Sequence, residues 1–407
     1  MKKQTLTIFW IIAGAGFIAG GYGLWDRLAN GHANAAYGSY VPWGLWVAEY
    51  IYFIGLSAGA FLLSTLVYVF NVRRLEKVGK LALLTALVTL LAAMFLIWMD
   101  IGHPERAWKL MFNTNFNSIM GWMIWLYTAY FILLLAELWF AMRGDLASWS
   151  SRSALARFLT FGRRDSSEAA LTADRRTLRV LGSIGVPLAV AFHGGVGALF
   201  GVLGSRPFWN SGITPIVFLV GALLSGGALL TFVAALFDPD RGTADHRGLV
   251  LFLGNIVLAL LALDVLLEWA EYSITYYSAI PASVDPLRMV LFGPHWWVFW
   301  GVHVGLGVVI PAILLVAGKH TPGKIAVAGL LIAVTFIAVR LNIVIPALVT
   351  PELQGLEQAF TGPGLTFAYF PSATEWLFGL WSASLAALVF LAGLHWLPIL
   401  NQPTEAA

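Results

Sequence analysis

Ten apolar segments, each long enough to cross a lipid bilayer, restrict what this chain of 407 residues can fold into. A membrane helix needs about 20 predominantly apolar residues, because its rise of about 1.5 Å per residue must span a hydrocarbon core about 30 Å thick. The segments lie approximately at residues 6–25, 43–70, 80–101, 118–141, 178–202, 212–237, 248–275, 295–317, 324–346 and 373–398. Only 11% of the residues are charged, against about 25% in ordinary soluble domains. The sequence therefore predicts an all-α polytopic membrane protein with about ten transmembrane helices.

The distribution of lysine and arginine predicts the orientation of these helices. If the N-terminus is cytoplasmic, 18 of the 24 Lys and Arg residues fall in cytoplasmic segments, as the positive-inside rule requires. Both termini are then cytoplasmic, and the protein is a multi-pass protein of a bacterial inner membrane. Residues 142–178 form the only long polar segment on that side, and we expect a solvated linker there.

The first apolar segment follows Met1-Lys2-Lys3 and resembles a secretory signal, with Ala33-Asn34-Ala35 as a candidate cleavage site. Its length of about 20 residues exceeds the 7–15 residues of a usual signal core. A retained helix is the favoured interpretation.

The stretch from Ile97 to Glu137 concentrates polar chemistry between two apolar runs. Asp100 ends the first run, His103 follows it, and Asn117 lies in an Asn-rich turn before the second run. An acid and an imidazole at the end of an apolar hairpin can exchange protons with a bound polar head group. We expect Asp100 and His103 to act in this way.

Several further ionisable residues lie within the predicted spans, where burial costs at least about 2.5–3.5 kcal/mol on insertion scales. The candidates for a proton pathway are Glu137, His193, Asp264, Glu268, Glu271 and Arg340. Asp264, Glu268 and Glu271 follow i,i+4 and i,i+3 spacing and share one helix face. Arg340 is the only fixed positive charge inside a span, so we expect it to pair with these acids. The alternative is that the acidic face is structural.

The chain contains no cysteine, which excludes disulfides and cysteine-ligated iron–sulfur clusters of its own. Any such cluster must belong to a partner. Two other function classes remain open from the residues alone. One is an ion- or proton-coupled transporter without a redox role, which ten helices and an acidic face would suit. The other is a b-type cytochrome anchor, for which His193 and His303 are candidate haem ligands.

Three groups of residues resemble the NrfD/PsrC family of membrane subunits, in its ten-helix branch. The first group is Pro-Trp-Gly-Leu-Trp at 42–46 with the small residues 55–60. The second is Asp-Ile-Gly-His-Pro-Glu-Arg-Ala-Trp at 100–108 with Asn117-Ser118. The third is Arg340-Leu341-Asn342 with Ala-Tyr-Phe-Pro-Ser at 368–372 and Glu375. That branch includes membrane subunits of quinone-linked hydrogenases, a Dsr-type sulfur-metabolism complex and alternative complex III.

The resemblance implies two four-helix bundles with the first and last helices flanking them. We expect residues 1–42 to hold the first helix and a periplasmic loop, and residues 43–202 and 203–346 to form the two bundles. Residues 347–407 would supply a periplasmic loop, the last helix and a cytoplasmic tail. The small residues 55–60 would either let helices approach closely or admit an isoprenoid tail.

The resemblance also implies a function. We expect a quinone- or quinol-interacting subunit of a respiratory oxidoreductase complex, with proton translocation as an open possibility. The quinone, menaquinone or ubiquinone, would be a bound substrate, with no haem or iron–sulfur cluster in this subunit. The candidate quinone-site residues are Glu49, Asp100, His103, Asn117 and Tyr369. Expected partners are a periplasmic ferredoxin-like iron–sulfur subunit, a catalytic subunit (hydrogenase, molybdopterin enzyme or sulfur-metabolism complex) and membrane lipid, with no nucleic acid.

Overall fold

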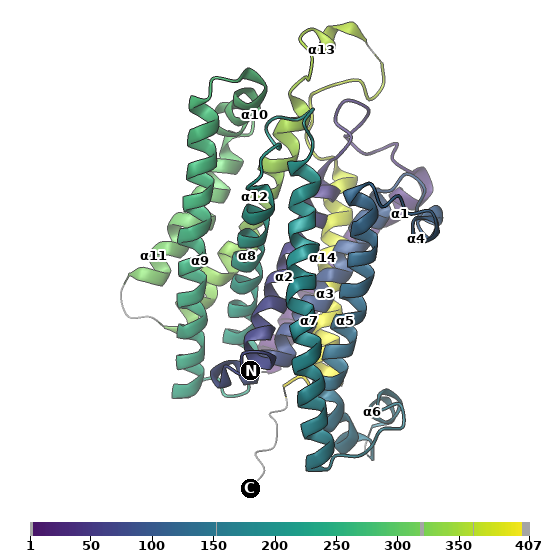
Figure 1. Ribbon diagram of the computed structural model, residues 1–407, viewed down its shortest axis with the longest axis vertical. Coiled ribbons are helices and arrows are strands. Elements are labelled where there is room, and N and C mark those ends of the chain that lie inside the picture. The colour runs from purple at the N-terminus through teal and green to yellow at the C-terminus, as the bar shows by residue number, and fades with distance from the viewer. Residues whose placement is uncertain (1–2, 152, 318–320, 361, 401–407) are drawn as a thin grey trace.

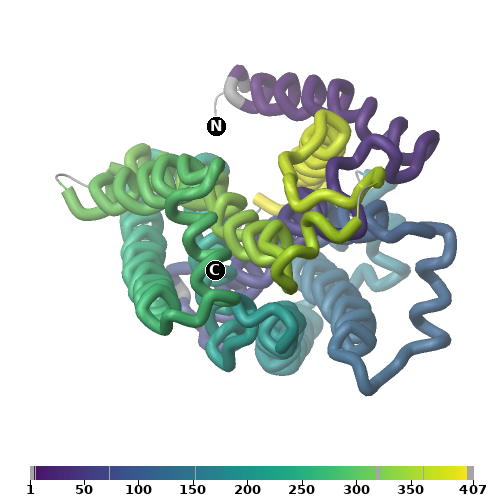
Figure 2. The backbone as a smooth tube through the Cα atoms, turned by 90° about the horizontal axis from the view of Figure 1, so that it is seen from above, coloured from purple at the N-terminus to yellow at the C-terminus, as the bar shows by residue number. Residues whose placement is uncertain are grey.

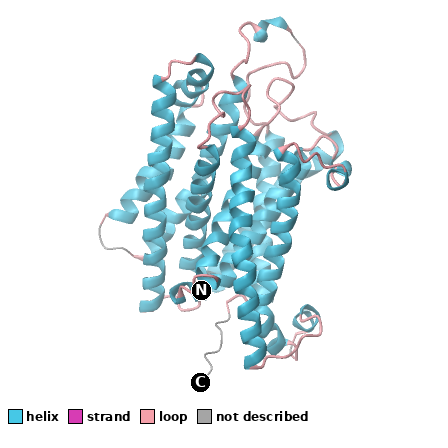
Figure 3. Cartoon of the chain, viewed as in Figure 1, coloured by secondary structure: helices cyan, strands magenta, loops and turns pink. Residues whose placement is uncertain are grey.

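Ten long apolar helices form the molecule and confirm the predicted spans. The computed structural model describes residues 3–151, 153–317, 321–360 and 362–400, and in this part of the chain it contains helices and loops but no strand (Figure 3). The predicted cytoplasmic termini, at residues 1–2 and 401–407, lie outside the described residues. The spans are α1 (Lys3–Asn30), α2 (Leu45–Tyr68), α3 (Gly79–Asp100), α5 (Ile119–Trp149), α7 (Glu168–Gly201), α8 (Thr214–Phe237), α9 (Ala244–Tyr277), η3 (Val298–Val309) continued by α11 (Ile310–Val316), α12 (Pro322–Val349) and α14 (Ala373–Trp396).

Shorter elements connect these spans. They are η1 (Arg73–Val78), η2 (Pro104–Arg106), α4 (Lys109–Phe112), α6 (Ala154–Leu159), α10 (Pro281–Phe292) and α13 (Leu356–Ala359). η3 is a π-helix, a wider form that is rare and is frequently found at functional sites.

The spans alternate in direction, which gives the molecule two distinct ends (Figure 1). The start of α1, the end of α14 and the connections that hold most of the Lys and Arg residues share one end, here named the basic end. The opposite, distal end holds α4, α10 and α13. α1 packs on α14, seen as the purple and yellow helices side by side in Figure 2, and α14 packs in turn on α3. α2, α7 and α12 all pack on α8. The four-part division of the chain stays a prediction.

The small residues 55–60 serve close helix packing. A Cβ atom on Gly59 would lie 2.0 Å from the carbonyl oxygen of Ala222, and one on Gly226 would lie 2.6 Å from the backbone nitrogen of Ala60. α2 and α8 therefore touch backbone to backbone, a contact that only glycine permits. Of the two roles left open for this run, the structure supports helix approach.

Residues 142–178 differ from the expected solvated linker, because most of them are helical. α5 continues to Trp149, α7 begins at Glu168, and α6 lies between them. Arg143, only 3% exposed, forms an ion pair of 2.5 Å with Asp174 that ties the two long helices together. The indole nitrogen of Trp139 donates to the carbonyl oxygen of Leu159 and holds α6 against α5. The polar residues of this segment therefore belong mostly to the ends of α5 and α7 and to α6.

Candidate functional site

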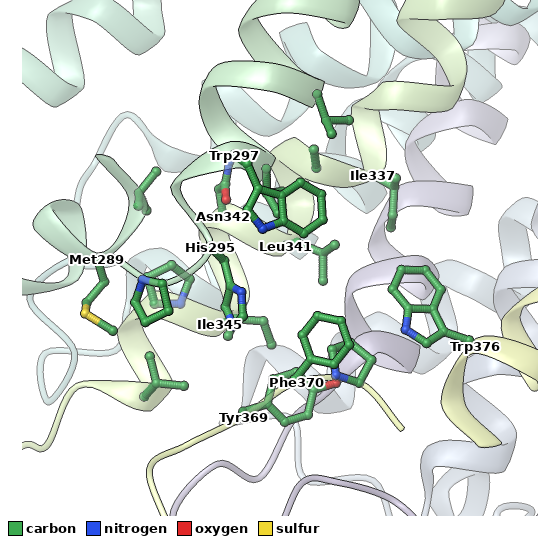
Figure 4. Close-up of a pocket in the computed structure, with 18 residues that line it drawn as sticks. Met289, His295, Trp297, Ile337, Leu341, Asn342, Ile345, Tyr369, Phe370 and Trp376 are labelled. Carbon is green, nitrogen blue, oxygen red and sulfur yellow. The ribbon is translucent and has the colours of Figure 1, made fainter. Parts of the chain in front are cut away.

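An apolar pocket opens at the distal end, between the start of η3, the last third of α12 and the segment that leads into α14 (Figure 4). Its cavity volume is about 190 Å³. Apolar and aromatic side chains make up most of its wall: Met289, Trp297, Ile337, Leu341, Ile345, Phe370 and Trp376. A pocket of this kind, with few polar groups, binds an apolar ligand and orients it through those groups.

Two polar side chains in the pocket are absent from the predicted site. Asn342 is 7% exposed, and its amide nitrogen has no hydrogen-bond partner among the described residues. His295 is exposed, and its ring centroid lies 5.4 Å from that of Phe370. A buried amide without a partner is costly, so a ligand that accepts its hydrogen bond would be favoured there. The sequence signals were the presence of Asn342 in the Arg340-Leu341-Asn342 group of the family resemblance and a histidine at the start of the eighth span.

Tyr369 is the one predicted quinone-site residue that lines the pocket. Its hydroxyl donates to Glu375 Oε1 at 2.6 Å and accepts from the backbone nitrogen of Leu45, also at 2.6 Å. Burial raises the pKa of the Tyr369 phenol, and the neighbouring Glu375 carboxylate raises it further. The tyrosine is therefore held protonated as a donor to the carboxylate.

Glu375 connects several segments beneath the pocket. Besides Tyr369, its carboxylate accepts hydrogen bonds from the backbone nitrogens of Ala36 (3.0 Å) and Ser372 (2.9 Å). It also forms a capping box with Ser372 at the start of α14, a motif that satisfies free N–H groups at a helix N-terminus. This fully buried acid therefore ties the segment that contains Tyr369, which lines the pocket, to the loop at Ala36 and the start of α2.

Asp100 and Glu375 both lie near Tyr37. Burial raises the pKa of the Tyr37 phenol, and the carboxylates of Asp100 and Glu375 raise it further, which places Tyr37 within electrostatic reach of both acids. Close by, Arg27 donates to the carbonyl oxygens of Met99 (2.6 Å) and Ile101 (2.8 Å) and so fixes the end of α3. Asp100 is thus linked to the pocket through Tyr37, Glu375 and Tyr369 rather than by lining it.

The other predicted quinone-site residues do not line the pocket. His103 is on the distal surface, where its Nδ1 lies 3.1 Å from Glu105 Oε1 and both side chains are 64% exposed. Asn117 is also exposed, in the turn before α5. Glu49 is buried on α2 against α14, where a Cβ on Gly379 would lie 2.1 Å from its Oε1. Of the five residues that were expected at one quinone site, the structure therefore places only Tyr369 at this pocket.

The predicted acidic face on α9 exists, but its direct partner is a histidine. His303 Nε2 of the π-helix lies 3.5 Å from Glu268 Oε2. The expected pairing with Arg340 is not a direct contact: among the described residues no ion pair within 4.0 Å joins Arg340 to Asp264 or Glu268, although Asp264 lies within electrostatic reach of the guanidinium. Arg340 instead turns toward α8, where its guanidinium lies 4.5 Å from the ring centroid of Phe218 and 5.1 Å from that of Phe336.

His193 and Arg340 meet around Phe218. The Nε2 atom of His193 donates to the Phe218 carbonyl oxygen at 2.8 Å, which leaves Nδ1 as a buried acceptor without a partner among the described residues. Arg340 Nε and Nη2 likewise have no described partner. Glu137 is farther toward the basic end, fully buried, and neither of its carboxylate oxygens has one. In the described part of the chain, no three His, Asp or Glu residues are placed to hold a metal ion.

Comparison with known proteins gives consistent matches over most of the chain. The family model described as "Polysulphide reductase, NrfD" matches residues 33–352. A selenate reductase subunit of Mesobacillus selenatarsenatis is 37% identical, with 100% of this chain and 96% of the relative covered. A putative dimethyl sulfoxide reductase membrane subunit of Halobacterium salinarum is 31% identical, with 95% of this chain and 90% of the relative covered. The Hdr-like menaquinol oxidoreductase integral membrane subunit of Archaeoglobus fulgidus is 29% identical, with coverage of 87% and 84%.

Proposed function

The chain belongs to the NrfD family, and we propose on that premise that it is the quinone-interacting membrane subunit of a respiratory oxidoreductase complex. The observation that carries this proposal is the apolar pocket with the unpartnered amide of Asn342 at its wall. The names of the relatives support it, since one is a menaquinol oxidoreductase subunit and others are subunits of reductases.

The quinone ring occupies the pocket in this proposal. The cavity is smaller than the 300–1,000 Å³ of a typical drug-sized site, so it suits a ring head group, with the isoprenoid tail outside along the apolar wall. The Asn342 amide donates to one quinone carbonyl. His295 lines the same pocket and, as an imidazole, can act as a general acid or base toward the second.

Quinone reduction consumes two electrons and two protons, and quinol oxidation releases them. The chain contributes no cysteine, so the electrons pass through a periplasmic iron–sulfur subunit docked at the distal end, joined to a catalytic subunit. Protons move between the pocket and the surface through Tyr369, Glu375, Tyr37 and Asp100. His103, beside Glu105, exchanges protons with water at the surface end of this route. The distal end then faces the periplasm of a bacterial inner membrane, and both termini are cytoplasmic.

A second proton route runs inward in the same proposal. Its groups are Glu137, His193, Asp264, Glu268, Glu271 and Arg340, with His303 as a contact of Glu268. Ionisable side chains buried at membrane depth are expensive, and those here include several polar atoms with no described partner. Such groups suit proton transfer through intervening water better than they suit packing.

The test is the substitution Asn342→Leu, which keeps approximate size and removes the donor. Loss of one ligand hydrogen bond of about 1–1.5 kcal/mol predicts a roughly tenfold loss of quinone-coupled electron transfer by the purified complex. Turnover of the catalytic partner with artificial dyes should be unchanged.

Asn117→Leu on the exposed distal turn is the matched control and should retain quinone turnover. If Asn342→Leu turns over quinone at the wild-type rate while Asn117→Leu or Asp100→Asn does not, the quinone binds at the distal hairpin and the pocket proposal is wrong.

A further inference from the structure

The connection between α5 and α7 presents apolar side chains to its surroundings. Leu155 is 42% exposed, Phe158 71% and Phe161 68%. Phe158 lies on α6 and Phe161 just after it, and α6 projects sideways at the basic end (Figure 1). Three large apolar side chains gathered in a polar connection indicate an interaction surface, because isolated exposed apolar residues are common but clusters are not.

The chemistry around these residues is basic. Arg157, Arg163 and Arg164 interleave with them along residues 155–164. Arg157 Nε donates to the carbonyl oxygen of Ser150 at 3.2 Å, and the Arg163 guanidinium lies 5.9 Å from the ring centroid of Trp139. Aromatic and aliphatic side chains interleaved with arginine are typical of segments that lie in the interface of an anionic membrane.

The depth of α6 supports that assignment. α6 is attached to α5 at Trp139, whereas at the distal end the indole nitrogen of Trp122 on the same helix donates to the Phe116 carbonyl oxygen. These attachment points are 17 residues apart on α5, or roughly 26 Å at 1.5 Å per residue. A hydrocarbon core is about 30 Å thick. If the distal hairpin marks one membrane interface, α6 is therefore at the level of the other.

The turn that ends α6 places the Phe161 ring at the surface. Phe161 has a φ of 47° and Gly162 a φ of 81°, both in the left-handed region. The backbone nitrogen of Phe161 donates to the Phe158 carbonyl oxygen, and that of Arg163 donates to the Thr160 carbonyl oxygen, so the turn is held by its own hydrogen bonds. The Phe161 ring is mostly exposed beside those of Phe158 and Trp139.

We propose that residues 155–164 are an interfacial anchor for anionic phospholipid at the basic end. Leu155, Phe158 and Phe161 enter the boundary between head groups and acyl chains, and Arg157, Arg163 and Arg164 bind the phosphate-bearing head groups. This anchor does not depend on the proposed quinone chemistry. It fixes the height and tilt of α5 in the bilayer, together with the hairpin at the distal end.

The absence of cysteine from the chain makes the test direct. A nitroxide spin label on Ala154→Cys reports on α6 without removing an anchor residue. The full chain is reconstituted into nanodiscs of phosphatidylcholine alone or with phosphatidylglycerol, and collisions with apolar oxygen are compared with those of a water-soluble nickel chelate. Ile132→Cys, exposed on the middle of α5, is the lipid standard, and Ser166→Cys, exposed in the same connection, is the water standard.

With phosphatidylglycerol, the ratio of oxygen to nickel collisions at Ala154→Cys should be several-fold higher than at Ser166→Cys. Replacing Arg157, Arg163 and Arg164 together by glutamine should lower that ratio toward the water standard, while Ile132→Cys stays unchanged and shows that the chain is still embedded. A ratio equal to that of Ser166→Cys in both lipids would overturn the proposal. So would a label shielded from both reagents, since that outcome indicates a protein partner on α6.

Discussion

Arg340 is an intramembrane charge with no acid at ion-pair distance among the described residues. The side chain is 1% exposed, and two aromatic rings face its guanidinium. Cation–π contacts are worth about 0.5–2 kcal/mol each, whereas the desolvation of a buried ion costs several kcal/mol. The rings therefore offset only part of this cost. An arginine kept at such a cost in stability is best explained by a role in function.

This balance predicts that Arg340→Met leaves the melting temperature of the detergent-solubilised protein unchanged or raises it, because methionine fills similar space and carries no charge. Quinone-coupled proton movement in sealed vesicles should fall. The matched control is Arg143→Met, which leaves Asp174 buried without its partner and should cost about 3–5 kcal/mol. A marked loss of thermal stability in Arg340→Met alone would mean that a polar network stabilises this cation.

At the scale of the helix, α2 and α8 form a close junction between helices of the two predicted bundles. Gly59 and Gly226 face each other's backbones there, and Arg340 reaches the same junction, where a Cβ on Gly221 would lie 3.2 Å from its Nη2. The packing of these helices therefore determines both the position of the arginine and the separation of the interior groups.

Gly59→Ala should force α2 and α8 apart, since its Cβ would meet backbone rather than a movable side chain. Overpacking of this kind costs about 1–3 kcal/mol, seen as a lower melting temperature. Gly194→Ala on α7 is the control, because a Cβ there has open space and alanine favours a helix by up to about 1 kcal/mol. Equal stability of the two variants would show that the junction adapts.

For the whole molecule, the decisive property is which end faces which compartment. The basic end holds the long α5–α7 connection, and the distal end holds the α13 segment and the pocket (Figure 1). Every assignment of proton uptake, proton release and partner docking depends on this orientation.

Single cysteines placed at the two ends test the orientation in intact cells. Gln354→Cys beside α13 should react with a membrane-impermeant maleimide added from outside, and Ser166→Cys should react only after the inner membrane is opened. Both positions are exposed, so accessibility within the protein does not limit either reaction. The reverse pattern would invert the proposed orientation and move the pocket to the cytoplasmic side.

The sequence by itself determined the fold class and the ten spans. A helix crosses a bilayer when its apolar run is long enough, and the length and hydrophobicity of a run are local properties of the sequence. It also singled out the acidic face of α9, since i,i+4 spacing is fixed by the helix itself. It placed Tyr369 in the site through a family resemblance.

Only the tertiary structure decided how the helices turn about their axes, and with that which polar groups meet. The folding of the 369–376 segment over α12 makes Asn342 and His295 part of one pocket and leaves His103 and Asn117 on the surface. The guanidinium of Arg340 lies over the ring of Phe218 and beside Gly55 and Gly221, whose lack of side chains leaves room for it. Which side chains meet depends on the packing of helices that are far apart in the chain, and the spacing of residues within one helix does not determine that packing.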